Sequence, residues 1–273
     1  MLTLENISAG YNGSPVLQNV AVNITAGEFV GLIGPNGSGK TTLLRVISGV
    51  LPARQGVVWL GERKLREMSR RDVAKMVAHL LQDRALGLAF SVREVVLMGR
   101  SPHLPRFGGE TERDLAIVER AMELANVSHI ADRPITEISG GERQRAFIAM
   151  CLAQEPQVLL LDEPTSHLDI GHQLSVLNLI RSLNRQTRMT VVAVFHDLNL
   201  AAEYCDRLVL LDRGQVVVAG TPADVLTTEM IQNVYEASVF VGRNPVSDGP
   251  HIILSSNEYP ATARKSATPR HDS

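Results

Sequence analysis

A glycine-rich loop between an apolar run and a helical segment constrains this chain more than any other feature of its sequence. Residues 34–41 read GPNGSGKT and fit the pattern G-x-x-x-x-G-K-[ST] at every fixed position. Residues 29–33 before the loop form an apolar run, as in a strand buried in a parallel sheet. Residues 40–48 after it carry their apolar side chains at helical spacing. This order predicts a loop whose backbone amides surround phosphate groups at the positive end of a helix.

The loop supplies most of the predicted nucleotide-binding residues. Lys40 is expected to reach the β- and γ-phosphates, and the Thr41 hydroxyl is expected to hold Mg²⁺. A plain glycine-rich turn before a helix is the alternative, and the agreement between motif and context argues against it. The predicted phosphate-binding set is Gly34, Asn36, Gly37, Ser38, Gly39, Lys40, Thr41 and Thr42.

A second apolar run, at residues 158–161, ends in two carboxylates, Asp162 and Glu163. A buried parallel strand would deliver Asp162 to the same sheet edge as the phosphate loop, where it could hold Mg²⁺ through water. Glu163 would then be placed to polarise an attacking water molecule. Strands often end in acidic residues, so this motif is weak alone. Downstream of a phosphate loop, the catalytic interpretation is the better one.

A third segment, residues 138–145, reads ISGGERQR. Ser139 and Glu142 have the spacing of a capping box, so an ordinary capped helix is one interpretation. A serine and two glycines at a helix N-terminus also make a second anion cradle, with exposed amides and a hydroxyl. A chain with two phosphate cradles suggests a nucleotide held between two chains.

Together these motifs resemble those of the nucleotide-binding subunits of ABC transporters, and the resemblance covers about residues 2–226. The family signature is Leu-Ser-Gly-Gly-Gln, where this chain has isoleucine at 138 and glutamate at 142. The resemblance implies an ATPase that uses ATP and Mg²⁺ and pairs head to tail with a second copy of itself. The residues that would contact the nucleotide of the other copy are Ser139, Gly140, Gly141, Glu142 and Asp169.

The resemblance also assigns roles to residues outside these motifs. Tyr11 matches the aromatic residue that stacks on adenine, and the alternative is a strand aromatic on the face of the sheet. Gln82 matches the glutamine that contacts Mg²⁺ and the attacking water. His196 matches the histidine that contacts the γ-phosphate, which gives Glu163, His196 and Gln82 as the catalytic set. The metal set is Thr41, Gln82 and Asp162. The remaining histidines, His172 among them, are interpreted as structural or surface residues.

The alternation of strands and helices predicts an α/β fold. We expect a P-loop NTPase core with a mostly parallel sheet, an N-terminal antiparallel β subdomain and an inserted α-helical subdomain. The ATPase domain should span residues 1–240, with the helical subdomain at about 86–154. A short C-terminal β segment should follow at 241–256, and the polar residues 257–273 are expected to be disordered.

Three features resemble the ATPases of iron-siderophore, haem and vitamin B12 importers. They are the stretch SVREVVLMGRSPH at residues 91–103, the stretch SHLDIGHQ at 166–173, and a length that leaves no room for a regulatory domain. The resemblance implies a transmembrane permease docked near residues 82–105 and a substrate-binding protein as an indirect partner. Leu86, Leu88 and Phe90 are apolar residues of this segment that a partner would cover, and the alternative is that they simply cap the helical subdomain.

Two other classes of protein compete with the importer interpretation. A soluble ABC protein of translation or DNA repair usually carries two cassettes, a coiled-coil insertion or zinc-binding cysteines, and none of these is seen in the sequence. A small-molecule kinase or GTPase could share the phosphate loop, but Ser139 and His196 would have no role there.

Composition limits the partners and the compartment. The formal net charge of −2 argues against nucleic acid as a partner, because such binding needs a basic face. The two cysteines, Cys151 and Cys205, form neither a CxxC pair nor a metal cluster, so we expect reduced thiols in the cytosol. No apolar stretch approaches the roughly 20 residues of a membrane helix. If the chain serves a membrane, it must dock on another chain, and the resemblance implies a peripheral subunit on the cytoplasmic face of the inner membrane.

Overall fold

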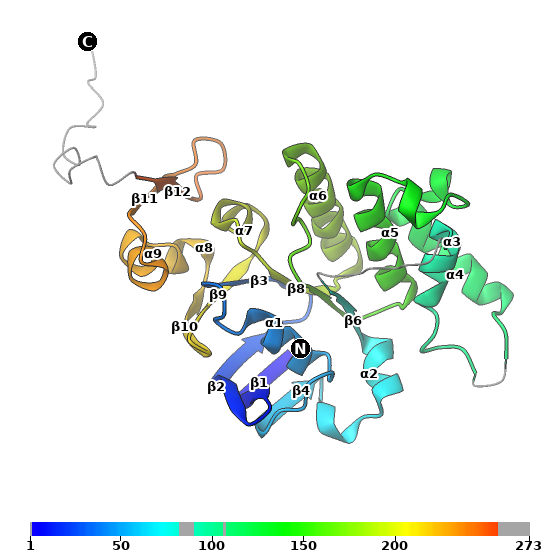
Figure 1. The fold of residues 1–273 in the computed structure, drawn as a ribbon, viewed down its shortest axis with the longest axis horizontal. Helices are drawn as coiled ribbons and strands as arrows, with labels where there is room; N and C mark the ends of the chain where they lie inside the picture. The colour runs from blue at the N-terminus through cyan, green and yellow to red at the C-terminus, as the bar shows by residue number, and fades with distance from the viewer. Residues whose placement is uncertain (1, 82–89, 106–107, 256–273) are drawn as a thin grey trace, which may run out of the picture.

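The computed structural model describes residues 2–81, 90–105 and 108–255 of the 273-residue chain (Figure 1). Two predicted features fall outside the described residues: Gln82 of the catalytic and metal sets, and the apolar pair Leu86 and Leu88 of the docking segment. The C-terminal tail, residues 257–273, falls outside them as well. Within the described part of the chain, no helix is both long and apolar enough to span a membrane.

A six-stranded sheet forms the centre of the fold, in the order β10-β9-β3-β8-β7-β6. Strands β9, β3, β8, β7 and β6 run parallel, and β10 pairs antiparallel with β9. Every residue of β3, β7 and β8 is buried, because helices or the second sheet cover both faces. The strands are β3 (Phe29–Ile33), β6 (Val77–Leu80), β7 (Val158–Leu161), β8 (Thr190–Val194), β9 (Arg207–Asp212) and β10 (Gln215–Gly220).

An antiparallel sheet in the order β2-β1-β4-β5 packs beside the central one (Figure 1). Buried residues alternate with exposed ones along β2, as expected for a sheet with one wet face. Helix α1 (Lys40–Ile47) contributes to the apolar core that the two sheets share. The strands are β1 (Leu2–Tyr11), β2 (Ser14–Ile24), β4 (Gln55–Leu60) and β5 (Arg63–Lys64).

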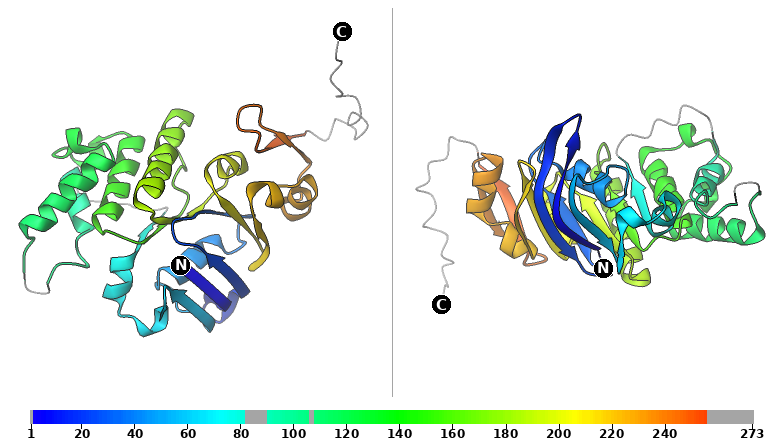
Figure 2. Two further views of the ribbon diagram at one scale, coloured as in Figure 1. Left: turned by 180° about the vertical axis from the view of Figure 1, so that it is seen from behind. Right: turned by 90° about the horizontal axis from the view of Figure 1, so that it is seen from below.

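A helical lobe extends beyond β6, at the opposite end of the molecule from the C-terminal hairpin (Figure 2). Its main helices are α3 (Val92–Met98), α4 (Glu112–Leu124) and α5 (Gly140–Ala153), with short turns η2 (Ser128–Ile130) and η3 (Ile135–Glu137). Each main helix begins with a complete capping box, at Ser91, Thr111 and Ser139. The lobe shares one apolar core with the second face of the central sheet.

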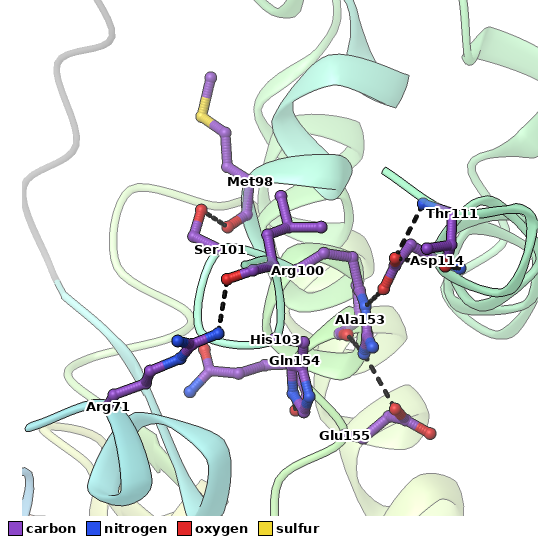
Figure 3. A network of polar contacts seen from close by, with 11 residues as sticks. Arg71, Met98, Arg100, Ser101, His103, Thr111, Asp114, Ala153, Gln154 and Glu155 are labelled. Carbon is purple, nitrogen blue, oxygen red and sulfur yellow. Dashed lines mark hydrogen bonds and ion pairs between the residues drawn. The ribbon is translucent and has the colours of Figure 1, made fainter. Parts of the chain in front are cut away.

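A buried arginine ties the three main helices of the lobe together (Figure 3). Arg100 is 3% exposed, and its guanidinium donates to Asp114 at 2.9 Å, to the Ala153 carbonyl at 2.7 Å and to Glu155 at 2.9 Å. Arg71 of α2 (Arg70–Met76) donates to the carbonyls of residues 102 and 104, at 2.7 and 2.5 Å. The lobe is therefore joined by polar bonds both internally and to the core.

The remaining elements complete the cover of the central sheet. Residues of α6 and α7 belong to the core on the face that the helical lobe also covers. Strands β11 and β12 pair as a hairpin from Val239↔Leu254 to Arg243↔Pro250. These elements are η1 (Leu65–Glu67), α6 (Ile170–Thr187), α7 (Leu198–Tyr204), α8 (Pro222–Val225), α9 (Thr228–Tyr235), β11 (Val239–Arg243) and β12 (Pro250–Leu254). The fold class predicted from the sequence, including the antiparallel subdomain and the helical insertion, is confirmed.

Candidate nucleotide-binding and hydrolysis site

The predicted phosphate loop connects β3 to α1 in the conformation that its glycines permit. Gly34 has φ 145° and Gly39 has φ 103°, both in the region that side chains rarely adopt. A Cβ on Gly34 would overlap the carbonyl oxygen of Leu211, so this position also lacks space for a side chain. Ser38 is 2% exposed, and its hydroxyl has no hydrogen-bond partner among the residues described. A buried hydroxyl without a partner inside a loop of this kind fits a phosphate ligand.

Lys40 lies inside this loop. Its Nζ donates to the carbonyl oxygens of Gly34 and Pro35, each at 2.8 Å. Burial lowers the pKa of the ammonium, while the negative charges of Glu163 and Asp162 act in the opposite direction. The lysine is thus held at the centre of the loop by two neutral acceptors, which an anionic ligand could replace.

The pair Thr41 and Asp162 provides oxygen atoms at the base of the loop. Asp162 follows β7 and is 3% exposed, and its Oδ1 accepts a hydrogen bond from the Thr41 hydroxyl at 3.2 Å. Burial raises the pKa of the Asp162 carboxyl, and the hydrogen bond from Thr41 opposes this effect. A hydroxyl and a carboxylate are the ligand types that Mg²⁺ prefers, so the donor set fits this ion.

Glu163 and His196 meet beside the loop. Glu163 Oε1 and His196 Nε2 lie 2.5 Å apart, although the residues come from the ends of two different strands. The backbone of Glu163 has φ 52°, a left-handed conformation that costs about 1–3 kcal/mol for a non-glycine residue. A hollow of about 290 Å³ is lined by Val16, Asn36, Gly37, Gly39, Lys40, Thr41, Thr42, Glu163 and His196. Except for Gly34 and Ser38, the predicted phosphate-binding residues therefore line one cavity with Glu163 and His196.

Tyr11, the predicted adenine-stacking residue, lies at the end of β1 and is 37% exposed. Arg45 of α1 donates to its hydroxyl at 2.9 Å, and the Arg45 guanidinium lies 5.9 Å from the ring centroid. The sequence analysis did not identify Arg45. The helical register offered a signal, since Arg45 lies one turn beyond Thr41 on the same face of α1.

The serine of the predicted second cradle is a helix cap in this structure. Ser139 Oγ accepts from the Glu142 N–H at 3.3 Å and donates to Glu142 Oε2 at 2.7 Å. The same carboxylate accepts from the Ser139 N–H at 2.9 Å, and the Ser139 hydroxyl first, then its N–H, lowers the Glu142 pKa. Residues 139–142 do not line the described cavity that contains Lys40. The structure therefore places the two cradles apart within a single chain.

The loop ending at Asp169 lies against this second cradle. Asp169 caps α6, with its Oδ1 accepting from the His172 N–H at 2.8 Å. Leu168 and His172 are the nearest neighbours of Gly140 and Gly141, respectively. The two glycines of the second cradle thus lie beside the segment that contains Asp169. His172, interpreted from the sequence as a structural or surface residue, contacts both Asp169 and Gly141.

Comparison with known proteins places the chain in a family. The model for "ABC transporter" matches residues 17–166. The ferric enterobactin transport ATP-binding protein FepC of Escherichia coli is 39% identical, over 95% of this chain and 96% of its own length. The hemin import ATP-binding protein HmuV of Pseudomonas aeruginosa is 43% identical, over 93% of this chain and 99% of its own length.

Solved structures agree with this assignment. A structure described as an inward-facing metal-chelate type ABC transporter superposes with a TM-score of 0.83 at 28% identity, covering 94% of this chain and 98% of that one. A dimeric ATP-binding cassette in a post-hydrolysis state with ADP and Pi gives a TM-score of 0.71 at 28% identity, covering 81% and 99%. The chain belongs to the ABC transporter family. Within it, the chain is an ATP-binding subunit that hydrolyses ATP, as the sequence predicted.

Proposed function

We propose that the chain powers the import of an iron-siderophore, haem or cobalamin-type substrate through a membrane permease. The observation that carries the proposal is the Glu163–His196 pair, closed at 2.5 Å beside the phosphate loop, in a chain that matches import subunits along almost its whole length. Relatives named for ferric enterobactin and hemin support the substrate class. The permease determines which substrate crosses, because the ATPase subunit does not touch it.

Lys40, Thr41 and Asp162 would bind the phosphates and Mg²⁺, which neutralises phosphate charge when bound. Lys40 would exchange the Gly34 and Pro35 carbonyls for the β- and γ-phosphates. Glu163 Oε1 would orient a water and take its proton as the water oxygen attacks the γ-phosphorus and the bond to the β–γ bridging oxygen breaks. His196 Nε2 would hold Glu163 in place and face the γ-phosphate.

Two copies would face each other head to tail, so that each nucleotide lies between the loop of one chain and the second cradle of the other. Support comes from the distance between the two cradles in sequence and from the absence of residues 139–142 from the described cavity. The Ser139 hydroxyl has one proton, which it now donates to Glu142. On meeting a γ-phosphate, Ser139 would redirect that proton, with Glu142 still capping the helix through the Ser139 N–H.

The permease would dock near residues 82–105, on the cytoplasmic face of the membrane. Arg71 attaches the described end of this segment to α2. Beside α2 lies a hollow of about 690 Å³, with Val50, 69% exposed, at its edge. The proposal rests on the apolar residues Leu86 and Leu88 of the segment itself, because a single exposed apolar side chain such as Val50 needs no partner to explain it.

The test is ATP-driven uptake. The chain would be co-expressed with a permease encoded beside it and reconstituted into vesicles with the matching binding protein. We expect uptake that requires ATP on the side of the membrane that carries this subunit. Glu163→Gln should abolish this uptake. Uptake without this subunit, or ATP hydrolysis unaffected by Glu163→Gln, would refute the proposal.

A further inference from the structure

The ring of His172 lies between the loop that ends at Asp169 and the cradle of residues 139–141. In the proposed function, both of these segments contact the nucleotide of a second copy. On one side, both carboxylate oxygens of Asp169 lie 2.8 and 2.9 Å from His172 Nδ1. A carboxylate only accepts hydrogen bonds, so Nδ1 carries the proton and donates it. The His172 N–H and then its ring hold the pKa of Asp169 below its usual range.

On its other side, the ring rests on the backbone of Gly141. A Cβ at that position would lie 2.9 Å from His172 Cγ and 3.0 Å from its Nε2, which is closer than side chains pack. Gly141 lies in the first turn of α5 with no left-handed φ, so its backbone would accept another residue. The neighbouring Gly140 has only an ordinary contact, with Leu168 at 3.5 Å. The ring of His172 in this position therefore leaves no room for a side chain at 141.

We propose that His172 is a positioning residue that joins the Asp169 loop to the Ser139–Gly141 cradle, so that both approach the nucleotide of a second copy as one unit. The proposal rests on the function proposed above. His172 would act through its neighbours, since its ring is bonded to Asp169 and packed on Gly141. A misplacement of about 1 Å in such groups can reduce a rate by about 10²-fold.

The primary test compares two substitutions at this position in the full chain. His172→Leu removes the hydrogen bond from the ring to the Asp169 carboxylate. The backbone N–H of residue 172 still donates to that carboxylate, so the cap of α6 should remain intact. We expect kcat for ATP to fall roughly 10-fold or more, with KM for ATP within about 2-fold, because Lys40 and Thr41 are unaffected. His172→Asn places an amide N–H where Nδ1 was and should restore most of kcat.

The second test uses the packing against Gly141. Gly141→Ala should reduce kcat by a larger factor in the natural chain than in a His172→Ala background, because the ring that the new Cβ overlaps is gone in the second case. The same fold loss from Gly141→Ala in both backgrounds would show that the ring and this position are not coupled, and would overturn the steric argument. His251→Leu, on the distant hairpin, is the matched control and should be silent.

The outcomes separate this inference from the proposed function. Unchanged kcat in His172→Leu, with an active natural chain, would overturn the role of His172 alone. A joint fall in kcat, ATP affinity and melting temperature would show a merely structural residue and would also overturn it. If the natural chain and Glu163→Gln hydrolyse ATP equally, the proposed function fails instead.

Discussion

The most quantitative prediction concerns Arg100, the arginine that joins α3, α4 and α5. Arg100→Met keeps the aliphatic stem but leaves Asp114, whose side chain is 9% exposed, without its charged partner, while the two hydrogen bonds from Thr111 remain. The Ala153 carbonyl also loses its donor, whereas Glu155 at 47% side-chain exposure regains water. Removing one partner of a buried ion pair costs about 3–5 kcal/mol. The half-exposed Glu155 pair adds at most about 1 kcal/mol.

This cost should be visible in thermal unfolding. At about 2–4 °C per kcal/mol for a domain of this size, Arg100→Met should lower Tm by roughly 6–20 °C. Arg100→Lys should be intermediate, because an ammonium cannot make the same diverging bonds. Arg120→Met removes an exposed arginine from α4 and should change Tm by about 1 °C or less. A Tm for Arg100→Met within about 2 °C of the natural chain would refute the reasoning.

The same network predicts an acid limit. Hydrogen bonds from the Thr111 side chain and backbone, with the Arg100 guanidinium, lower the pKa of Asp114 to about 2. A carboxyl whose pKa is depressed on folding contributes stability above its unfolded value of about 3.9 and loses it as the pH falls through its folded value. Stability should therefore decline between about pH 4 and 2. Arg100→Met removes one of the groups that lower the pKa of Asp114, so the loss of stability should be complete at a higher pH. Unfolding measured at each pH would show this shift.

Three further predictions concern the site. Glu163→Gln should reduce turnover about 10²–10⁴-fold while nucleotide affinity is retained, and near-normal steady-state turnover would remove Glu163 from catalysis. Tyr11→Ala should weaken ATP binding by about 1–3 kcal/mol, as for other bases stacked on aromatic residues, when affinity is measured by fluorescence titration. Arg45→Met should have a smaller effect in that titration. Burial raises the pKa of Asp162, so the activation of ATP hydrolysis by Mg²⁺ should begin to weaken at a higher pH than it would with an exposed aspartate. Activation that is lost only in the pH range of an exposed aspartate would contradict this.

The sequence was sufficient for features that depend on local chemistry. The phosphate loop, the strand ending at Asp162 and the capping box at Ser139 each follow from residue types at fixed spacing, and each is present. Because carboxyl ends of parallel strands share one sheet edge, the meeting of Glu163 and His196 was also predictable.

Contacts between distant segments were not predictable from patterns. The helical register places Arg45 on the face of Thr41, but it does not show the contact of Arg45 with Tyr11. This contact and that of Arg100 with Asp114 depend on how elements pack. Strand β5 has two residues and α2 is mostly polar, so neither shows a clear hydrophobic period. The same limit applies to His172, whose role becomes visible only when Gly141 is seen beneath its ring.

The central claim is that a nucleotide lies between two copies of this chain. Its most direct test places cysteine at Ser38 in one copy and at Ser139 in the other, after Cys151 and Cys205 have been replaced. With Glu163→Gln holding ATP unhydrolysed in the assembled transporter, oxidation should give an inter-chain disulfide that ATP strongly favours, since a bridge requires Cα atoms within about 7 Å. A cross-link that forms equally well without nucleotide, or only within one chain, would contradict the account and leave Ser139 as a helix cap.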